Sequence, residues 1–325
     1  LVIAGDFDTE QAKAWVQKYF DEIPKGEEIT PLEKRSGEVA ETVKLYHEDN
    51  YARLPELTYV WPAVELYHPD SYAIDVLANY LTRGKSAPFY QVLVEEKQLT
   101  SNVSAFNYSS ELAGQIQFRV RAYPDTDLDS VATAIDEAFA RFEENGIPEK
   151  DLRRIKAGQE TSFYRGLSSV LGKSFNLAQY NIFAGDPGFV EQDIKNILNV
   201  TAEDVMRVYE TYIKDKHYIA TSFVPKNQPE LALSGSEEAE VVIEPIVQGA
   251  EEEFDPSVTA EYEKTPSSFD RSQEPPYGEE PEIILPEIWE TELDNGLTVI
   301  GIENDEVPLV NINLSIEGGH LLDEI

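Results

Sequence analysis

The sequence contains no cysteine and only four histidines among its 325 residues. Without cysteine, disulfide scaffolds, cysteine-type zinc sites, iron–sulfur clusters and thiol catalysis are excluded. Basic residues are also scarce, since 26 Lys and Arg stand against 62 Asp and Glu, and the net charge is −36. A chain with so few cations is poorly suited to replace the counterions of a phosphate backbone. We therefore expect no nucleic-acid partner, and cationic peptides or metal ions are the partners that charge favours.

Long apolar runs are absent as well. No stretch of about 18 uncharged apolar residues occurs, so we expect no membrane span. Apolar residues make up 41% of the chain and aromatics 10%, which is enough for a folded core. The strand-like run Leu1–Asp6 starts without a Met or any lead-in, and a second one, Ile312–Glu317, lies close to the other end. We interpret both as cuts through structure, and we expect the chain to be a fragment of a longer protein.

Charge divides the chain more clearly than hydrophobicity does. Residues 227–292 hold 19 Asp and Glu, two Lys and Arg, and eight prolines. This composition is typical of an extended, self-repelling linker. We predict a compact domain over 1–224, an acidic Pro-rich linker over 225–286 and the truncated start of a second unit over 287–325.

Hydrophobic periodicity predicts the elements of the first part. The predicted strands lie at 1–7, 41–47, 54–64, 102–109, 115–123 and 217–224. The predicted helices begin near 9, 71, 87, 131, 148 and 201. This order is typical of an α+β fold, in which helices cover one face of a two-layer antiparallel sheet. After the linker, Asn295-Gly296 between two apolar runs predicts a β-hairpin, with a third strand near 312–317.

Three segments resemble pitrilysin/insulinase-type zinc peptidases. Val2-Ile3-Ala4-Gly5-Asp6-Phe7-Asp8, followed by a helix and by Ile23-Pro24-Lys25-Gly26, resembles the start of the family's C-terminal domain. Residues 88–103 resemble its helix–turn–strand, and Leu293–Val299, continuing to Gly319, resembles the start of the N-terminal domain. The resemblance implies a metallohydrolase-like peptidase domain in a protein of two similar halves, which close around an unfolded peptide. The chain is then the C-terminal domain of one half, the inter-half linker and the start of the next half.

Catalysis in this family implies the inverzincin motif His-x-x-Glu-His on a helix, where two His bind Zn²⁺ and the Glu polarises a water. None of the four histidines, His47, His68, His217 and His320, has a second His at the required spacing. We therefore expect no catalytic residue and no metal ligand in this chain. The resemblance implies zinc only in the parent protein, a zinc metalloendopeptidase.

The family also uses an Arg and a Tyr, supplied by the opposite half, to hold the substrate carbonyl. Here Val94 stands at the Arg position and Ser101 at the Tyr position, and neither is a cationic or phenolic donor. This departure fits a domain of the zinc-bearing half and fits equally a half that has lost catalysis.

Three residues are predicted to bind substrate. They are Ser101, Phe106 on a strand edge suited to β-addition of a peptide, and Arg165 beside a helix break. The alternative for each is ordinary: pairing within its own sheet, or a solvated surface position.

The leading hypothesis is a non-catalytic chamber wall and hinge of a zinc metallopeptidase that hydrolyses peptides in a closed two-half chamber. The alternative is a non-catalytic homologue that serves as a peptide-binding or assembly scaffold, and a third possibility is an unrelated acidic binding module. The expected partners are peptide substrates and the opposite half or a homologous subunit. The expected location is the bacterial periplasm or outside the cell.

Overall fold

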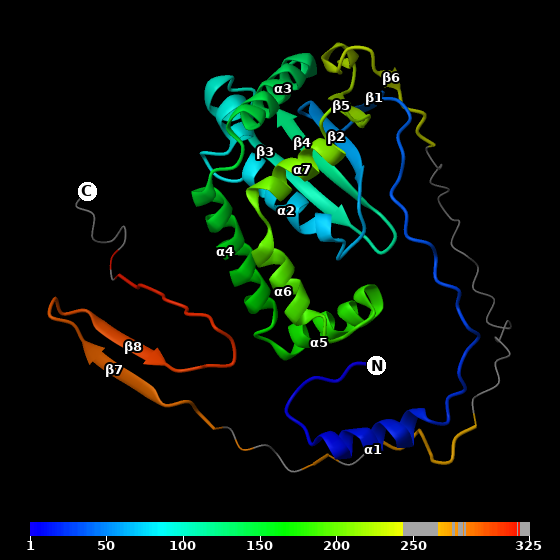
Figure 1. The fold of residues 1–325 in the computed structure, drawn as a ribbon, viewed down its shortest axis with the longest axis vertical. Helices are drawn as coiled ribbons and strands as arrows, with labels where there is room; N and C mark the ends of the chain where they lie inside the picture. The colour runs from blue at the N-terminus through cyan, green and yellow to red at the C-terminus, as the bar shows by residue number, and fades with distance from the viewer. Residues whose placement is uncertain (243–265, 275–276, 279–281, 283, 317, 319–325) are drawn as a thin grey trace.

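A six-stranded sheet forms the centre of the fold in this computed structural model (Figure 1), which describes residues 1–242, 266–274, 277–278, 282, 284–316 and 318. The strand order is β3-β4-β2-β5-β1-β6. The strands are β1 (Val43–Asp49), β2 (Glu56–Ala63), β3 (Thr100–Ser109), β4 (Gly114–Ala122), β5 (Ile219–Pro225) and β6 (Glu237–Glu238).

Strand β2 shows how the sequence creates two different faces. Its side chains alternate between half-buried and buried, and Leu57, Tyr59, Trp61 and Ala63 all point into the core. Antiparallel pairing joins β3 to β4, β4 to β2 and β2 to β5, whereas β1 lies parallel to both β5 and β6. The predicted α+β class with helices on one face is confirmed, and the parallel pairs make the sheet mixed rather than wholly antiparallel.

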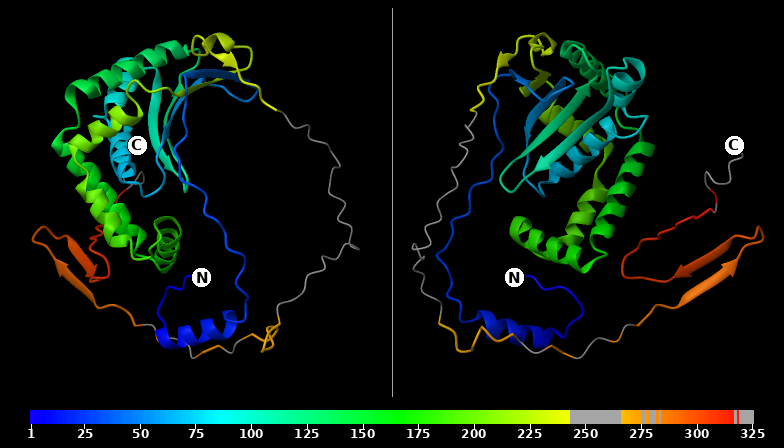
Figure 2. Two further views of the ribbon diagram at one scale, coloured as in Figure 1. Left: turned by 45° about the vertical axis from the view of Figure 1, so that its right-hand side comes forward. Right: turned by 180° about the vertical axis from the view of Figure 1, so that it is seen from behind.

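Helices cover the face that carries the buried side chains. Seen from behind in Figure 2, the strands lie in front of the helices and the second face is uncovered. The helices near the sheet are α2 (Pro69–Thr82), α3 (Leu128–Asn145) and α7 (Ala202–Tyr212), with the π-helix η1 (Tyr90–Glu96) beside α3 and β3. The helix predicted to begin near residue 87 is present, but it is largely a π-helix, whose turns are wider than those of an α-helix.

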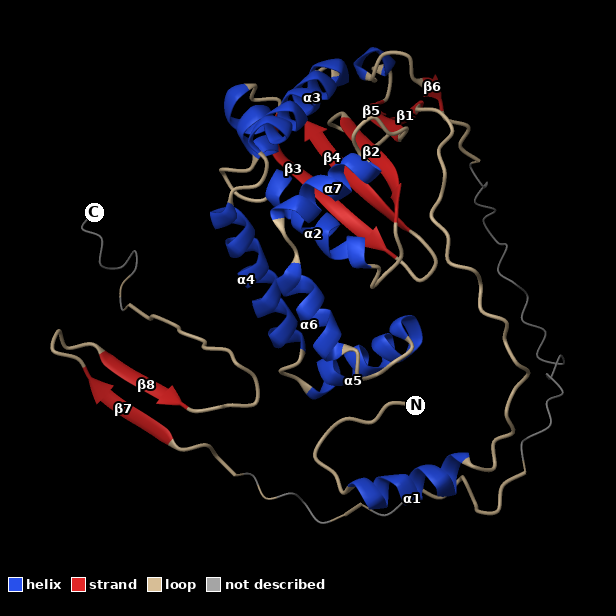
Figure 3. Ribbon diagram, in the orientation of Figure 1, coloured by secondary structure: helices blue, strands red, loops and turns tan. Residues whose placement is uncertain are grey.

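A second group of helices extends from the end of α3 (Figure 3). It consists of α4 (Glu149–Gly166), α5 (Val170–Gln179), the π-helix η2 (Tyr180–Ala184) and α6 (Val190–Asn199). Helices α4 and α6 run side by side, and α2 contacts both. None of the helices in the described part of the chain is long and apolar enough to cross a membrane.

The core lies between the sheet and the near helices. Phe89, Phe118 and Phe142 are completely enclosed, and Trp61 packs edge-on against Phe118 with 5.7 Å between ring centroids. Each large aromatic that leaves water contributes roughly 2–3 kcal/mol, so these side chains add to the stability that the many buried Leu, Ile and Val residues of the core supply.

The folded body continues past residue 224. A short 3₁₀-helix, η3 (Pro229–Leu231), places Leu231 in the core, and Leu233 follows it with 4% exposure. Strand β6 then pairs with β1. The division at 224 and 286 stays a prediction, but the first 14 residues of the predicted linker pack on the domain.

The two ends of the chain differ from the expectation. Residues 1–7 form no strand, although helix α1 (Thr9–Phe20) follows as predicted, capped by Asp8. Helix α1 has no buried residue, and the ring of Tyr19 contacts Phe269 from the predicted linker at 5.0 Å between centroids. Apolar sequence alone did not suffice for a strand, because a strand also needs a partner for its backbone groups.

The predicted hairpin is present as β7 (Ile288–Glu292) paired with β8 (Thr298–Ile302). Gly296 has φ of 82°, a left-handed conformation that glycine adopts at low cost. Residues 312–316 form no third strand, so that part of the prediction is wrong within the described residues.

Candidate functional site: the uncovered face of the sheet

A groove with a volume of about 750 Å³ crosses the uncovered face of the sheet. At its centre Glu56 of β2 accepts hydrogen bonds from Arg121 of β4, with a shortest distance of 2.8 Å, and lies 3.5 Å from Arg119. The register explains the contact, because Glu56 stands directly opposite Arg121. Glu56 is 18% exposed, whereas the two arginines are 46% and 65% exposed. One carboxylate therefore orients two guanidinium groups whose remaining donors face the groove.

A third cation, a second carboxylate (Asp49) and two aromatic rings also line the groove. Arg53 and Tyr51 come from the loop before β2, and Phe223 comes from β5. His47 packs against Phe223 with 5.3 Å between ring centroids. Three arginines in one groove are unusual in a chain with a net charge of −36. The groove therefore suits carbonyl or carboxylate oxygens, which guanidinium groups bind with directed hydrogen bonds.

Ser101 lies in a second groove of about 360 Å³ that shares Arg119 and Arg121 with the first. The register of β3 on β4 shifts between Thr100 and Val103, which is a β-bulge. Both Ser101 and Asn102 are exposed at this bulge, so the usual alternation is interrupted there. The hydroxyl of Thr100 donates to the carbonyl of Arg121 at 2.6 Å and fixes the bulge.

The other two predicted residues lie elsewhere. Phe106 is half-buried further along β3, where its ring faces Tyr108 at 5.7 Å between centroids. Since Val103 and Ala105 point into the core, alternation places Phe106 on the uncovered face. Arg165 is exposed in the last turn of α4 and lines neither groove. The structure thus puts Ser101 and Phe106 on one strand and leaves Arg165 on a separate helix. Their predicted role in binding substrate stays a prediction.

The histidines are dispersed. His68 caps the N-terminus of α2, where its Nδ1 accepts a hydrogen bond from the backbone N–H of Asp70 at 3.1 Å. His217 lies 3.3 Å from the hydroxyl of Thr42, and His320 is outside the described residues. Within the described part of the chain, no three His, Asp or Glu side chains gather in a way that suits a metal ion.

A family model described as the peptidase M16 inactive domain matches residues 1–159. These residues, just under half of the chain, are similar to the peptidase M16 family. The match confirms the likeness to pitrilysin/insulinase-type peptidases, and its description agrees with a non-catalytic part of a peptidase. None of the curated proteins compared with this chain has a matching sequence.

Solved structures support the fold. A protease from Helicobacter pylori has a TM-score of 0.60 and 20% identity, over 68% of this chain and 54% of that one. A peptidase M16 inactive domain from Pseudomonas fluorescens has a TM-score of 0.56 and 16% identity, over 73% and 54%. The periplasmic protease PqqL from Escherichia coli has a TM-score of 0.57 and 14% identity, over 68% and 25%. The chain thus spans about half or less of these similar proteins.

Within the matched residues, the two positions that depart from the pitrilysin/insulinase pattern lie on neighbouring elements, η1 and β3. Val94 is half-buried in η1, and Ser101 stands at the bulge of β3. The helix–turn–strand that carries them has the expected form, so the change lies in the side chains and not in the backbone.

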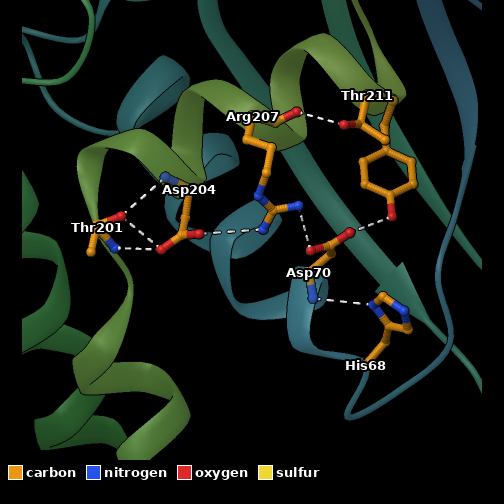
Figure 4. Close-up of polar contacts among 7 residues, drawn as sticks. His68, Asp70, Thr201, Asp204, Arg207 and Thr211 are labelled. Carbon is orange, nitrogen blue, oxygen red and sulfur yellow. Dashed lines mark hydrogen bonds and ion pairs between the residues drawn. The ribbon is translucent and has the colours of Figure 1, made fainter.

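A polar network joins α7 to the start of α2 (Figure 4). The Arg207 guanidinium lies 2.8 Å from Asp70, whose other oxygen accepts a 2.6 Å hydrogen bond from Tyr212. Burial and this bond raise the pKa of the Tyr212 phenol, and Asp70 raises the pKa of Arg207. Thr201 and Asp204 cap each other at the start of α7, and this holds the pKa of Asp204 below its usual value. Each group has a partner within the network, so its role is to fasten two helices.

The groove arginines were visible in the sequence only as polar residues alternating along a strand. Arg119 and Arg121 alternate with Phe118, Val120 and Ala122, which predicts a wet sheet face. Their convergence on Glu56 depends on the pairing of β2 with β4, and no spacing in the sequence specifies that pairing.

Proposed function

We propose that this chain forms a non-catalytic chamber wall and hinge of a zinc metallopeptidase, whose two halves close around peptide substrates. The peptide bonds would be cleaved at a zinc ion bound elsewhere in the parent protein. The match to an M16 inactive domain and the absence of His-x-x-Glu-His from the whole sequence support this role.

The observation that carries the proposal is the uncovered sheet face with its three arginines. A wall must offer a surface that enclosed peptides can touch, and a sheet with helices on only one side leaves such a surface. The paired Arg119 and Arg121 would bind backbone carbonyls or acidic side chains of the peptide, with Ser101 and Phe106 further along the same face. The acidic segment 225–286 would connect the halves, and its surplus charge would keep it extended.

The opposite half of the same protein, or a homologous subunit, would supply the remaining walls. We infer a periplasmic or secreted location from the periplasmic protease among the similar structures. Zinc would be the cofactor of the parent protein.

The wall can be tested by reversing charge in the groove of the full-length parent. The Arg119→Glu/Arg121→Glu variant is compared with the parent on two quenched peptides that differ only in carrying Glu or Gln near the cleaved bond. We expect KM for the Glu peptide to rise several-fold while kcat changes little, because the groove binds substrate and performs no chemistry.

The matched control is Lys150→Glu/Arg153→Glu, which reverses two exposed charges on α4, outside both grooves. Equal effects of the groove variant and the control on KM would show that only net charge matters. An unchanged KM in the groove variant would contradict the proposal that the groove binds the peptide substrate.

A second candidate is a non-catalytic homologue that serves as a peptide-binding or assembly scaffold. Val94 and Ser101 are compatible with it, since neither is a cationic or phenolic donor, but they fit a domain of the zinc-bearing half equally well. The full-length parent distinguishes the two functions: hydrolysis that a zinc chelator abolishes supports the peptidase, whereas binding of the same peptides without hydrolysis supports the scaffold.

A further inference from the structure

A cavity of about 660 Å³ lies between α2, α4 and α6, on the helical side of the domain. We call it the three-helix cavity. Its lining is more polar than a helix–helix contact requires: Ser71, Asp75, Asn79 and Arg83 recur every four residues along the face of α2 that borders it. Residues four apart lie on one face of a helix, so this polar stripe follows the length of the cavity.

Two oxygen acceptors stand at one part of the cavity, and only Asp75 has a neighbouring donor, the side chain of Asn107. The carboxylate of Asp75 reaches solvent through the cavity, but protein atoms surround it on its other sides. This surrounding protein raises the pKa of Asp75 to about 6, and a hydrogen bond from Asn107 opposes the rise. The side-chain oxygen Oε1 of Gln159, on α4, is buried and has no hydrogen-bond partner among the described residues. A buried acceptor without a donor is costly, so an occupant that donates N–H groups is favoured here.

Cations line another part of the same cavity. Arg83 is the extended C-cap residue of α2, and the helix rises about 10 Å from Asp75 to its last residue, Thr82. Its guanidinium makes no ion pair within the described residues. Arg154 of α4 also lines the cavity and shares its charge with Asp151 at 3.2 Å. The cavity therefore presents a negative group and positive groups at separate positions on one helix pair.

Aromatic surface lies at the end of the cavity beyond Asp75 and Gln159, on the side away from Arg83 and Arg154. Tyr67 and Phe163 offer aromatic surface to the cavity. Asp193, the second carboxylate of the lining, is 9% exposed, and its two oxygens accept hydrogen bonds from Tyr72 at 2.6 Å and Tyr180 at 2.7 Å. Because Asp193 is already satisfied, Asp75 is the carboxylate available to an occupant.

We propose that the three-helix cavity binds a short peptide of about two to four residues whose two termini are both free, since each extended residue spans about 3.3 Å. Its ammonium group would contact Asp75 and Gln159, its carboxylate would contact Arg83 and Arg154, and an apolar side chain on its first residue would reach toward Tyr67 and Phe163 beside the ammonium end. A single amino acid is too short to reach both groups. A purely cationic or purely anionic ligand would leave one of the two charged positions unmatched. The site needs neither zinc nor hydrolysis, so it stands independently of the function proposed above.

The test is isothermal titration calorimetry of the full 325-residue chain with the tripeptide Phe-Ala-Ala, whose aromatic side chain is on the residue with the free ammonium group. We expect saturable one-to-one binding of the free tripeptide. Acetylation of its N-terminus or amidation of its C-terminus should each weaken binding by about tenfold or more, because each removes one charge-assisted contact.

Three variants locate the binding. Asp75→Asn should weaken binding of the free tripeptide but leave binding of the acetylated tripeptide unchanged. Arg83→Gln should likewise weaken binding of the free tripeptide but leave binding of the amidated tripeptide unchanged. Gly158→Phe should abolish binding, because Gly158 lines the cavity and a side chain there enters open space without meeting any atom within 4 Å. Arg153→Gln, on the exposed side of α4, is the matched control and should bind like the unaltered chain.

Thermal unfolding of each variant separates lost binding from lost folding, and the two α2 variants keep the test decisive if Gly158→Phe does not fold. Binding that is unaffected by acetylation or amidation of the tripeptide, or that persists in all three folded variants, would overturn the proposal. An absence of saturable binding at millimolar tripeptide would overturn it too.

Discussion

The phenol of Tyr72 donates a 2.6 Å hydrogen bond to Oδ1 of Asp193, although 121 residues separate the two in the chain. Tyr180 donates to the other oxygen at 2.7 Å, so the buried carboxylate is satisfied on both sides. Burial, reinforced by these bonds, raises the pKa of both phenols far above the usual value, and they stay protonated donors at any physiological pH. This contact fastens α6 and η2 to α2.

Replacing Asp193 should therefore cost the domain much of its stability. The Asp193→Ala variant leaves two buried phenol donors unpaired, and we expect its free energy of unfolding to fall by about 2–4 kcal/mol. Urea unfolding followed by circular dichroism measures the change. Glu191→Ala removes an exposed carboxylate from the same helix, 3.7 Å from Lys195, and should cost less than about 0.5 kcal/mol. Similar losses in both variants would contradict the fastening role.

The raised pKa of Asp75 predicts in which direction the folding stability changes with pH. Burial raises its pKa from the ordinary 3.8 to about 6, so between these values the folded chain binds more protons than the unfolded chain. Folding stability from this group therefore falls as the pH rises through that window, and the unfavourable contribution is complete above it. We expect Asp75→Asn to match the original chain near pH 3.5 and to become the more stable of the two by pH 7.

The measurement for Asp75 is the difference between the urea midpoints of the two proteins at a series of pH values. Taking the difference cancels the titration of the many other carboxylates. The charged groups that line the same cavity, Arg83, Arg154 and Asp193, are present in both proteins. A difference that stays constant from pH 3.5 to pH 7 would show that the pKa of Asp75 is not raised.

Two glycines should respond in opposite directions to alanine. A Cβ at Gly114, in the first position of β4, would lie 2.0 Å from the carbonyl oxygen of Val64, so Gly114→Ala should destabilise the domain by about 1–3 kcal/mol. A Cβ at Gly158, inside α4, meets nothing within 4 Å, so Gly158→Ala should stabilise it by roughly 0.5–1 kcal/mol. Thermal unfolding of the two variants compares them, and a stabilised Gly114→Ala variant would contradict the close approach of β4 to Val64.

Much of the fold was accessible from local patterns. The alternation in β2, the helical spacing in α2 and α3 and the Asn-Gly turn before β8 each reflect neighbours in sequence, and the structure has all of them. Pairing between distant segments was not accessible: the parallel contact of β1 with β5 joins residues about 175 apart in the chain. For the same reason Leu231 and Leu233, which join the core, were assigned to the linker by their acidic surroundings.

The candidate sites could be predicted less well from the sequence, because each is formed by residues of separate elements that meet only in the folded chain. Ser101 was found through a family likeness, and its exposure at a bulge depends on the register of β3. The three-helix cavity had one signal in the sequence, the polar stripe from Ser71 to Arg83 in an otherwise buried helix. That stripe alone is typical of a solvated helix face, and only the packing of α4 and α6 against it makes a cavity.

The central claim is that any zinc of the parent protein is bound outside this chain, and equilibrium dialysis of the purified 325-residue chain against Zn²⁺ tests it most directly. Histidines dispersed over separate elements can bind zinc weakly at the surface but cannot supply the three or four converging ligands of a tight site. The account predicts bound zinc far below one ion per chain at micromolar free zinc. Tight binding of one zinc ion per chain would contradict it.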